Sequence, residues 1–516
     1  MPPMVLASLQ HIYVKGKGIE MLKESEIKRL IEEDALSDKK RKAREGQRYY
    51  EAEHDILQYR MFYYNADGIL VEDKARSNSR ICHPFFTEHV DQLAAYIMSF
   101  EENPIRAKDT ADGLQEHLDL YFDDEFWAEI QELITGTNAK GFEYLYAFKN
   151  AEDRLMFQCA DSLGVVEVRA KDTDDSCEYI IYWYVERIGK DKKRIKKIQV
   201  HDKDQIWFYE QEDDGAIVLD ADEAINPRPN IIWKDKDTDT YYSGKTLGFI
   251  PFWRLDNCRK QFSGLKPIKA LIDDYDLMEC GLSNNVQDFD TPIHLVKGFP
   301  GDDLNELQQN IKTKKIVSLD NDGGIDIKTI DIPYQARKTK ADEDEKNIYR
   351  FGMAFNSAQA GDGNITNVVI RSRYTLLDLK AKKLIKRLKR FLKNIIRVVL
   401  DEINTKNGTD YQYSDVEVVF EPVIPTNEKE NAEISKIEAE TEQIRINSIL
   451  NAAAIIGDEE VLKALCDILD RDYKELQGQL EQINASQNTI DAQTLLEGTV
   501  TDDEQTAEAG TATIPE

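Results

Sequence analysis

One stretch of the sequence constrains the fold more than any other, because it predicts a single long rod. Between Gly264 and Phe289, apolar residues recur at intervals of three and four, the spacing of one face of an α-helix. Pro267 falls in the first turn, where a helix tolerates proline. About 25 residues at 1.5 Å each make a rod of roughly 35–40 Å. The apolar stripe consists of Ile268, Leu271, Ile272, Tyr275, Met278, Leu282, Val286 and Phe289.

The other face of this predicted helix is acidic, with Asp273, Asp274, Asp276 and Glu279. The whole chain shares this character, since 97 Asp+Glu against 67 Lys+Arg give a formal net charge of -30. Strong acidity disfavours a surface that binds duplex DNA, because phosphates are attracted to positive surfaces. It is compatible with a surface that DNA passes without being trapped.

The rest of the sequence mixes helical and strand patterns. Segments rich in aromatic and β-branched residues lie between Phe142 and Trp253, and helical patterns lie on both sides of them. At 516 residues we expect more than one folding unit, of the α+β class. No run of about 18 apolar residues predicts a membrane span. The six cysteines include no Cys-x-x-Cys, which disfavours a zinc ribbon.

A second long amphipathic helix is predicted from 368 to about Asn404, and it is basic. Nine basic residues and no acidic one lie between Lys380 and Arg397, and apolar residues fill the other half of the helical wheel. Three interpretations remain open: a solvated face, an interface with an acidic surface such as a neighbouring subunit, or direct contact with nucleic acid. The residues of the candidate interface are Lys382, Lys383, Lys386, Arg387, Lys389, Arg390 and Lys393.

Motifs that would support catalysis are sparse. No P-loop is present, and the Gly-x-Gly at Gly361–Gly363 is better explained as a loop than as a phosphate cradle. His54 beside Asp55 could belong to a metal-dependent hydrolase, but further ligands are missing at recognisable spacing, which favours a surface or capping histidine. The stretch CHPFFTEH lacks a second ligand pair for zinc. We therefore predict no catalytic residue, no metal and no cofactor.

The order of elements is more specific than any motif. A rod-like helix leads to a small α/β insertion, and a return helix, a Gly-rich polar loop and the basic helix follow. Supporting stretches, spread over roughly Tyr49–Leu480, are YYEAEHDI, HPFFTEHVDQLAAYIMSFEENPI, GFIPFWRLDN, IKALIDDYDLMECGLSNNVQDF, DNDGGIDIKTIDIPYQA and RYTLLDLKAKKL. Together they resemble the portal proteins of tailed bacteriophages, particularly phages with long non-contractile tails that infect Gram-positive bacteria. The loop NSAQAGDGNITNVVI departs most from the usual family sequence.

The resemblance implies a ring subunit with a helical stem, a small α/β clip, a β-rich and helical wing, and a helical crown. It assigns 1–262 to the wing, 263–289 and 336–358 to the two stem helices, 290–335 to the clip, 359–367 to the tunnel loop, 368–425 to the rest of the wing, 426–496 to the crown and 497–516 to a disordered tail.

The resemblance also implies a function without enzymatic activity. A ring of about 12 subunits would form the DNA channel at one capsid vertex, for genome packaging, retention and ejection. Implied partners are passing double-stranded DNA, a large terminase ATPase, a head-completion or adaptor protein, and the major capsid and scaffolding proteins, with no membrane. The protein would assemble in the host cytoplasm and reside in the virion.

Residue roles follow from the same resemblance. The acidic residues of the first stem helix would line the channel, and the basic helix would form half of a subunit contact. The tunnel-loop residues that would face DNA are Gly361, Asp362, Gly363, Asn364, Thr366 and Asn367. Two alternatives remain: a metal-dependent nucleic-acid hydrolase around His54 and Asp55, and a helical scaffold protein without a channel.

Overall fold

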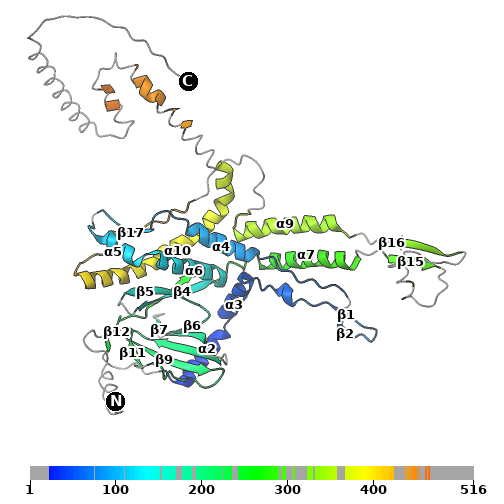
Figure 1. Ribbon diagram of the computed structural model, residues 1–516, viewed down its shortest axis with the longest axis horizontal. Coiled ribbons are helices and arrows are strands. Elements are labelled where there is room, and N and C mark those ends of the chain that lie inside the picture. Colours follow the sequence, from blue (N-terminus) through cyan, green and yellow to red (C-terminus); the bar gives the residue numbers. More distant parts are fainter. Residues whose placement is uncertain are drawn as a thin grey trace, which may run out of the picture. The chain divides into compact units, whose positions relative to one another are not determined.

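The computed structural model describes residues 22–423 and short helical pieces between 436 and 464 (Figure 1). Within 22–423 it omits 75, 110, 151–153, 170–176, 189–192, 224, 235–241, 290–292, 298–321 apart from two helical residues, 329–331 and 357–366. The chain divides into two compact units, one of 1–364 with 368–425 and one of 365–367 with 426–516. In the second unit all the described residues are helical. The tail predicted at 497–516 lies outside the described residues, as does most of the predicted crown.

The first unit combines helices and sheets, which confirms the α+β class. Its largest core surrounds the basic helix α10 (Asn367–Asn407), which buries Leu384, Leu388, Leu392 and Ile395. Three helices share this core: α4 (Phe85–Ile97), α5 (Leu114–Tyr121) and α6 (Asp124–Lys140). So do a three-stranded sheet, in the order β14 (Phe252–Asp256), β4 (Phe142–Lys149) and β5 (Leu155–Ala160), and the strand pair β17 (Val416–Val418) and β3 (Ile105–Ala107). The 3-10 helix η4 (Tyr413–Asp415) directly precedes β17.

Helix α6 has signals at both ends that position it between the helices and the sheet. Asp123 caps its N-terminus by accepting from the N–H of Phe126 at 3.0 Å. Gly141 ends it with a positive φ of 97°, and a Cβ at this residue would lie 2.4 Å from the carbonyl oxygen of Gln261. Only glycine fits this turn without strain.

A second, antiparallel sheet uses the two-residue periodicity of its strands to serve two cores. Tyr179 and Ile181 face one core, which α2 (Glu24–Ala35) covers with Ile27 and Ile31. Ile180 faces the other core, shared with α3 (Asp38–Tyr50) and β4. The strands are β6 (Val165–Arg169), β7 (Cys177–Ile188), β8 (Lys193–His201), β9 (Gln205–Glu212), β10 (Val218–Leu219) and β11 (Arg228–Pro229), and a separate hairpin pairs β12 (Ile231–Lys234) with β13 (Tyr242–Lys245).

The predicted rod is helix α7 (Lys269–Phe289), and α9 (Tyr334–Gly352) runs antiparallel beside it (Figure 1). The two are bridged by Lys340, whose ammonium lies 2.6 Å from the Asp274 carboxylate. Both helices are shorter than the patterns suggest. α9 stops at Gly352 rather than near 357 because Met353 adopts the left-handed conformation, with φ 56°.

Two short hairpins accompany this helix pair. Between α7 and α9, β15 (Ile293–Lys297) pairs antiparallel with β16 (Gly324–Lys328). Within 298–321 of this insertion, Asn305 and Leu307 are described, and both are helical. The second hairpin, β1 (Phe62–Tyr64) and β2 (Leu70–Glu72), follows the short 3-10 helix η1 (Asp55–Gln58).

Candidate functional site along helix α7

An extended segment, 77–83, is attached to α7 by a regular series of hydrogen bonds. The backbone N–H groups of alternate residues each donate to a side chain of every fourth residue of the helix. The pairs are Ser77 to Asp288 Oδ1 at 3.1 Å, Ser79 to Asn284 Oδ1 at 2.6 Å, Ile81 to Cys280 Sγ at 3.2 Å and His83 to Asp276 Oδ1 at 2.9 Å. We call this series the α7 ladder.

The α7 ladder depends on a match between two spacings. Four residues of α-helix advance about 6 Å, and two residues of extended chain advance about 6.6 Å. Side chains four apart also lie on nearly one stripe of a helix, as alternate N–H groups do on one edge of an extended segment. Four successive pairs can therefore form without bending either element.

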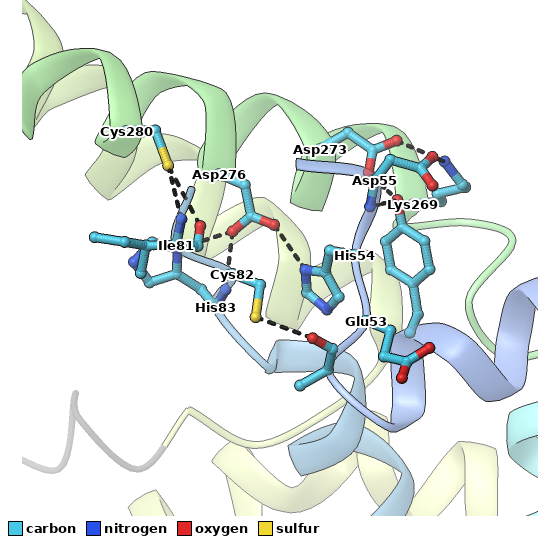
Figure 2. Close-up of polar contacts among 12 residues, drawn as sticks. Glu53, His54, Asp55, Ile81, Cys82, His83, Lys269, Asp273, Asp276 and Cys280 are labelled. Atoms are coloured by element: carbon cyan, nitrogen blue, oxygen red, sulfur yellow. Dashed lines mark hydrogen bonds and ion pairs between the residues drawn. The ribbon is translucent and has the colours of Figure 1, made fainter. Parts of the chain in front are cut away.

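Asp276 ends the ladder and is its most buried member. Its side chain has no exposed surface, and Figure 2 shows it between two imidazoles. His54 Nδ1 lies 2.6 Å from Oδ2, and His83 Nδ1 lies 2.8 Å from Oδ1. Burial opposes ionisation, but hydrogen bonds from His54 and His83 outweigh it and hold the pKa of the Asp276 carboxyl below its ordinary value. One carboxylate thus joins η1, the 77–83 segment and α7.

A second polar cluster lies one turn earlier on the same helix. Lys269 Nζ lies 2.7 Å from the Asp55 carboxylate and 2.8 Å from that of Asp273, which also accepts from the Tyr49 hydroxyl. Arg48 lies 2.6 Å from Asp55. Burial would raise the pKa of Asp55, but hydrogen bonds from Lys269 and Arg48 lower it to about 2. The Asp55 carboxylate is therefore held as an anion between two cations.

The C-terminal end of α9 is fixed to two other helices. The half-buried Lys380 of α10 donates from its ammonium to the carbonyl of Gly352 at 3.0 Å, and its partial burial lowers its pKa to about 8. The Gln92 side chain of α4 bonds both backbone groups of Phe355, at 2.8 and 3.0 Å, and the Phe355 ring stacks on Tyr374. The chain is thus held in place directly before residues 357–366, where the tunnel loop is predicted.

His89 lies at this junction as a buried histidine. Among the described residues neither ring nitrogen has a hydrogen-bond partner, and the ring packs against Gly352 and Tyr349. Burial, with a smaller contribution from the positive charge of Lys380, lowers the pKa of His89 to about 3. The folded protein therefore keeps this side chain neutral.

We expect His89 to make the fold sensitive to acid. Between about pH 6.5 and 3 the unfolded chain binds a proton at this residue and the folded chain does not, so the free energy of unfolding falls as the pH is lowered. The slope from this residue approaches about 1.4 kcal/mol per pH unit. His89→Leu should remove it, so urea midpoints of wild type and variant should diverge as the pH falls through this window. Parallel pH profiles would contradict the assignment.

The basic residues of α10 lie where the helical wheel predicts. Lys382, Lys383, Lys386 and Arg390 are exposed, whereas Arg387, Lys389 and Lys393 are half-buried. Lys382 forms an ion pair with Asp378 at 2.7 Å within its own helix. Lys393 lies over the ring of Tyr413, 5.0 Å from its centroid. Exposed cations thus form one face of a helix whose other face is core.

Two predictions about individual residues are wrong. Asp276 cannot be part of an exposed acidic face, since it is buried against His54 and His83. His54 is the N-cap residue of η1, but it is not a surface histidine and its side chain makes no capping bond, because it bonds Asp276 instead. Asp273 and Asp274 retain partial exposure and are each paired with a lysine, and Glu279 is half-buried.

The hydrolase alternative requires His54 and Asp55 to converge, and the zinc alternative requires a cluster of metal ligands. His54 bonds Asp276, whereas Asp55 faces Arg48 and Lys269, so the two neighbours do not converge. No group of three or more His, Cys, Asp or Glu side chains in the described part of the chain is arranged to hold a metal ion.

No described helix is long and apolar enough to cross a membrane. Of the predicted tunnel-loop residues, only Asn367 is described, as the first residue of α10.

Comparison with known proteins decides the family. The model of the family described as phage portal protein, SPP1 Gp6-like, matches residues 30–488, which is most of the chain. This chain belongs to that portal protein family. The portal protein of Bacillus phage SPP1 is 25% identical over 340 residues, 65% of this chain and 65% of that protein, or just under two thirds of its length. The portal protein of Clostridium phage phiCD119 is 21% identical over 420 residues, which cover 74% of this chain and 85% of that protein.

Membership in the portal family confirms the resemblance seen in the sequence.

The α7 ladder was not predicted from the sequence, although a signal for it was present. Asp276, Cys280, Asn284 and Asp288 recur every fourth residue, and Ser77 and Ser79 alternate in a segment with no helical pattern. Polar residues at four-residue intervals on a helix can indicate a surface that binds backbone N–H groups rather than water.

Proposed function

We propose that this chain is a subunit of a portal ring, the DNA channel at one vertex of a phage capsid. The observation that carries the proposal is the family match over residues 30–488. The antiparallel pair α7 and α9, joined by an insertion that contains the β15–β16 hairpin, is compatible with the stem and clip that this family membership suggests. DNA would enter through the ring during packaging, be retained by it, and leave through it at ejection.

Each part of the chain then has a role. The clip, 290–335, would bind the large terminase ATPase during packaging and the head-completion protein afterwards. The tunnel loop, 359–367, would contact passing DNA, and the crown, 426–496, would lie inside the capsid shell built from the major capsid protein. The ring would be a structural component of the virion without catalytic activity.

The charge of the chain suits a channel through which DNA slides. A net charge of -30 repels phosphates, so contacts with the duplex stay weak. Asp273, Asp274 and Glu279 remain the proposed acidic wall on α7. Lys269 and Lys340 neutralise part of this charge, so the wall would be mildly rather than strongly repulsive.

The α7 ladder would give the stem mechanical support. DNA that is pushed through a channel exerts force along the stem, and a helix held only at its ends would bend. Four hydrogen bonds at regular intervals connect α7 to the chain segment that leads into α4, so force on the stem would be shared with the largest core.

Imaging the purified protein tests the proposal. We expect closed rings of about 12 subunits with a central hole, because a heterologous contact that closes gives a ring. Native mass spectrometry of the same sample should give one dominant multiple of the 59.4 kDa chain. A monodisperse monomer, even with scaffolding protein added, would contradict the proposal, and metal-dependent cleavage of DNA that His54→Ala abolishes would favour the hydrolase alternative.

A further inference from the structure

The β1–β2 hairpin is regular, but it is a sheet of two strands. Its register pairs Phe62 with Glu72, Tyr63 with Val71 and Tyr64 with Leu70. The turn is ordered by Asn65, whose side-chain oxygen accepts from two backbone N–H groups at 2.9 and 3.0 Å. An isolated two-stranded hairpin is marginally stable in water, so we expect a hairpin with a regular register and an ordered turn to have a binding partner.

Both faces of this hairpin expose large apolar side chains. Because neighbours in a strand point to opposite faces, Phe62 and Tyr64 share one face with Leu70, and Tyr63 shares the other with Val71. Tyr64 is 73% exposed and Leu70 54% exposed. A contiguous apolar surface of this kind marks an interaction site, since scattered single residues would need no explanation.

The hairpin is presented from a fixed base. The α7 ladder holds 77–83, the segment that follows β2. Bonds across the two legs, from Asn78 to the carbonyl of Tyr59 and from Arg80 to that of Leu57, tie the incoming chain to the same base. Such a preorganised arm loses little conformational freedom when it binds.

The charges around the hairpin indicate what it binds. Its root carries four exposed cations, Arg60, Lys74, Arg76 and Arg80. The Arg60–Glu72 ion pair is 3.8 Å long and the Arg76–Asp73 pair 3.4 Å, and both arginines stay largely exposed, so these pairs stabilise the root little. A complementary surface must be apolar for the tip and acidic for the root. DNA lacks the first property, whereas another copy of this chain has both.

We propose that the β1–β2 hairpin is an assembly arm that packs on the stem helices of a second copy of this chain. This inference rests on the proposed ring. In a closed ring each subunit presents the same arm and the same receiving surface, so every exposed hairpin is covered once. The receiving stem exposes apolar Val286 on α7, and acidic Asp342 and Glu343 on α9. The arm adds an apolar contact to the electrostatic one proposed for the basic helix.

The test compares two double variants with equal changes in charge. Tyr64→Asp with Leu70→Asp places charges on the arm. The control, Leu36→Asp with Leu120→Asp, alters apolar residues of similar exposure, at 84% and 62%, outside the hairpin. Sedimentation velocity measures the concentration at which half of the protein is in rings. We expect it to rise at least tenfold for the arm variant and to stay within twofold of wild type for the control.

A second measurement uses the wild-type protein, so it does not depend on the variant's folding. Hydroxyl-radical footprinting should show Tyr63 and Tyr64 oxidised at least fivefold more slowly in rings than in monomers. Wild-type rings in which both tyrosines remain as reactive as in the monomer would overturn the arm while leaving the ring intact. Absence of rings in the wild type would instead overturn the proposed function itself. An arm variant that folds and assembles like the control would also overturn the inference.

Discussion

Asp276→Ala is expected to lower the free energy of unfolding by about 3 kcal/mol. The substitution removes the acceptor of three hydrogen bonds, from His54 Nδ1, His83 Nδ1 and the backbone N–H of His83. His54 is fully buried, so water cannot replace the lost carboxylate without rearrangement. The loss should appear as a lower urea midpoint. Hydrogen exchange should show faster exchange of the amides at Ser77–His83, because the ladder would lose its buried end.

Asp274→Ala provides a matched control on the same helix. Its carboxylate pairs with Lys340, but both side chains are about 40% exposed, and an exposed ion pair is worth less than about 1 kcal/mol. Asp276→Asn should fall between the two, because the amide keeps the shape but accepts more weakly than a carboxylate. If Asp276→Ala and Asp274→Ala cost the same, the buried carboxylate does not hold this region together.

The long helix was predictable because its apolar stripe is a local pattern, but the roles of its acidic residues were not. At 100° per residue, Asp273, Asp274, Asp276 and Glu279 spread over about 220° of the helix surface, so one exposed face could not contain all four. The helical wheel shows this spread, but it does not identify which of the four acidic residues is buried. That depends on His54, which is 222 positions away in the sequence.

The same limit applies to the β1–β2 hairpin and to the ends of α7 and α9. Alternation and an Asn-x-x-Gly turn favour a hairpin locally, yet its attachment to α7 requires contacts about 200 residues apart. The end of α9 depends on Met353, a residue type that does not favour the left-handed conformation it adopts. Gln92 and Lys380, from two other helices, hold the chain on either side of it. Tertiary contacts therefore override the local pattern there.

The basic helix shows the opposite case, in which sequence predicts placement well. Its apolar half enters the core, and its charged half stays outside, as the 3.6-residue period requires. Lys380 departs from this pattern in its role, because its half-buried ammonium reaches the last carbonyl of α9. An experiment on the assembled protein decides whether this charged half is solvated or forms an interface.

Lys386→Glu with Arg390→Glu is expected to abolish ring assembly at ordinary ionic strength. These two exposed residues lie one turn apart, and reversing both changes the net charge of the face by four. If the face contacts acidic groups of a neighbouring subunit, each reversal replaces attraction by repulsion across the contact. Repeated around a ring of about 12 subunits, even a loss of about 1.4 kcal/mol per contact, tenfold in affinity, would prevent closure. Native mass spectrometry should then show monomers and short oligomers.

Three comparisons separate an interface from a solvated face. Lys386→Gln with Arg390→Gln should weaken assembly less than the reversal does, because neutral groups attract less but do not repel. Arg41→Glu with Lys42→Glu makes the same change in net charge on the exposed side of α3 and should leave rings intact. Wild-type rings should weaken as salt is raised, because the Debye length shrinks from about 10 Å at 0.1 M to about 3 Å at 1 M. If the reversal variant forms rings at both low and high salt, the basic face is solvated, and the subunit contact must rest on other surfaces.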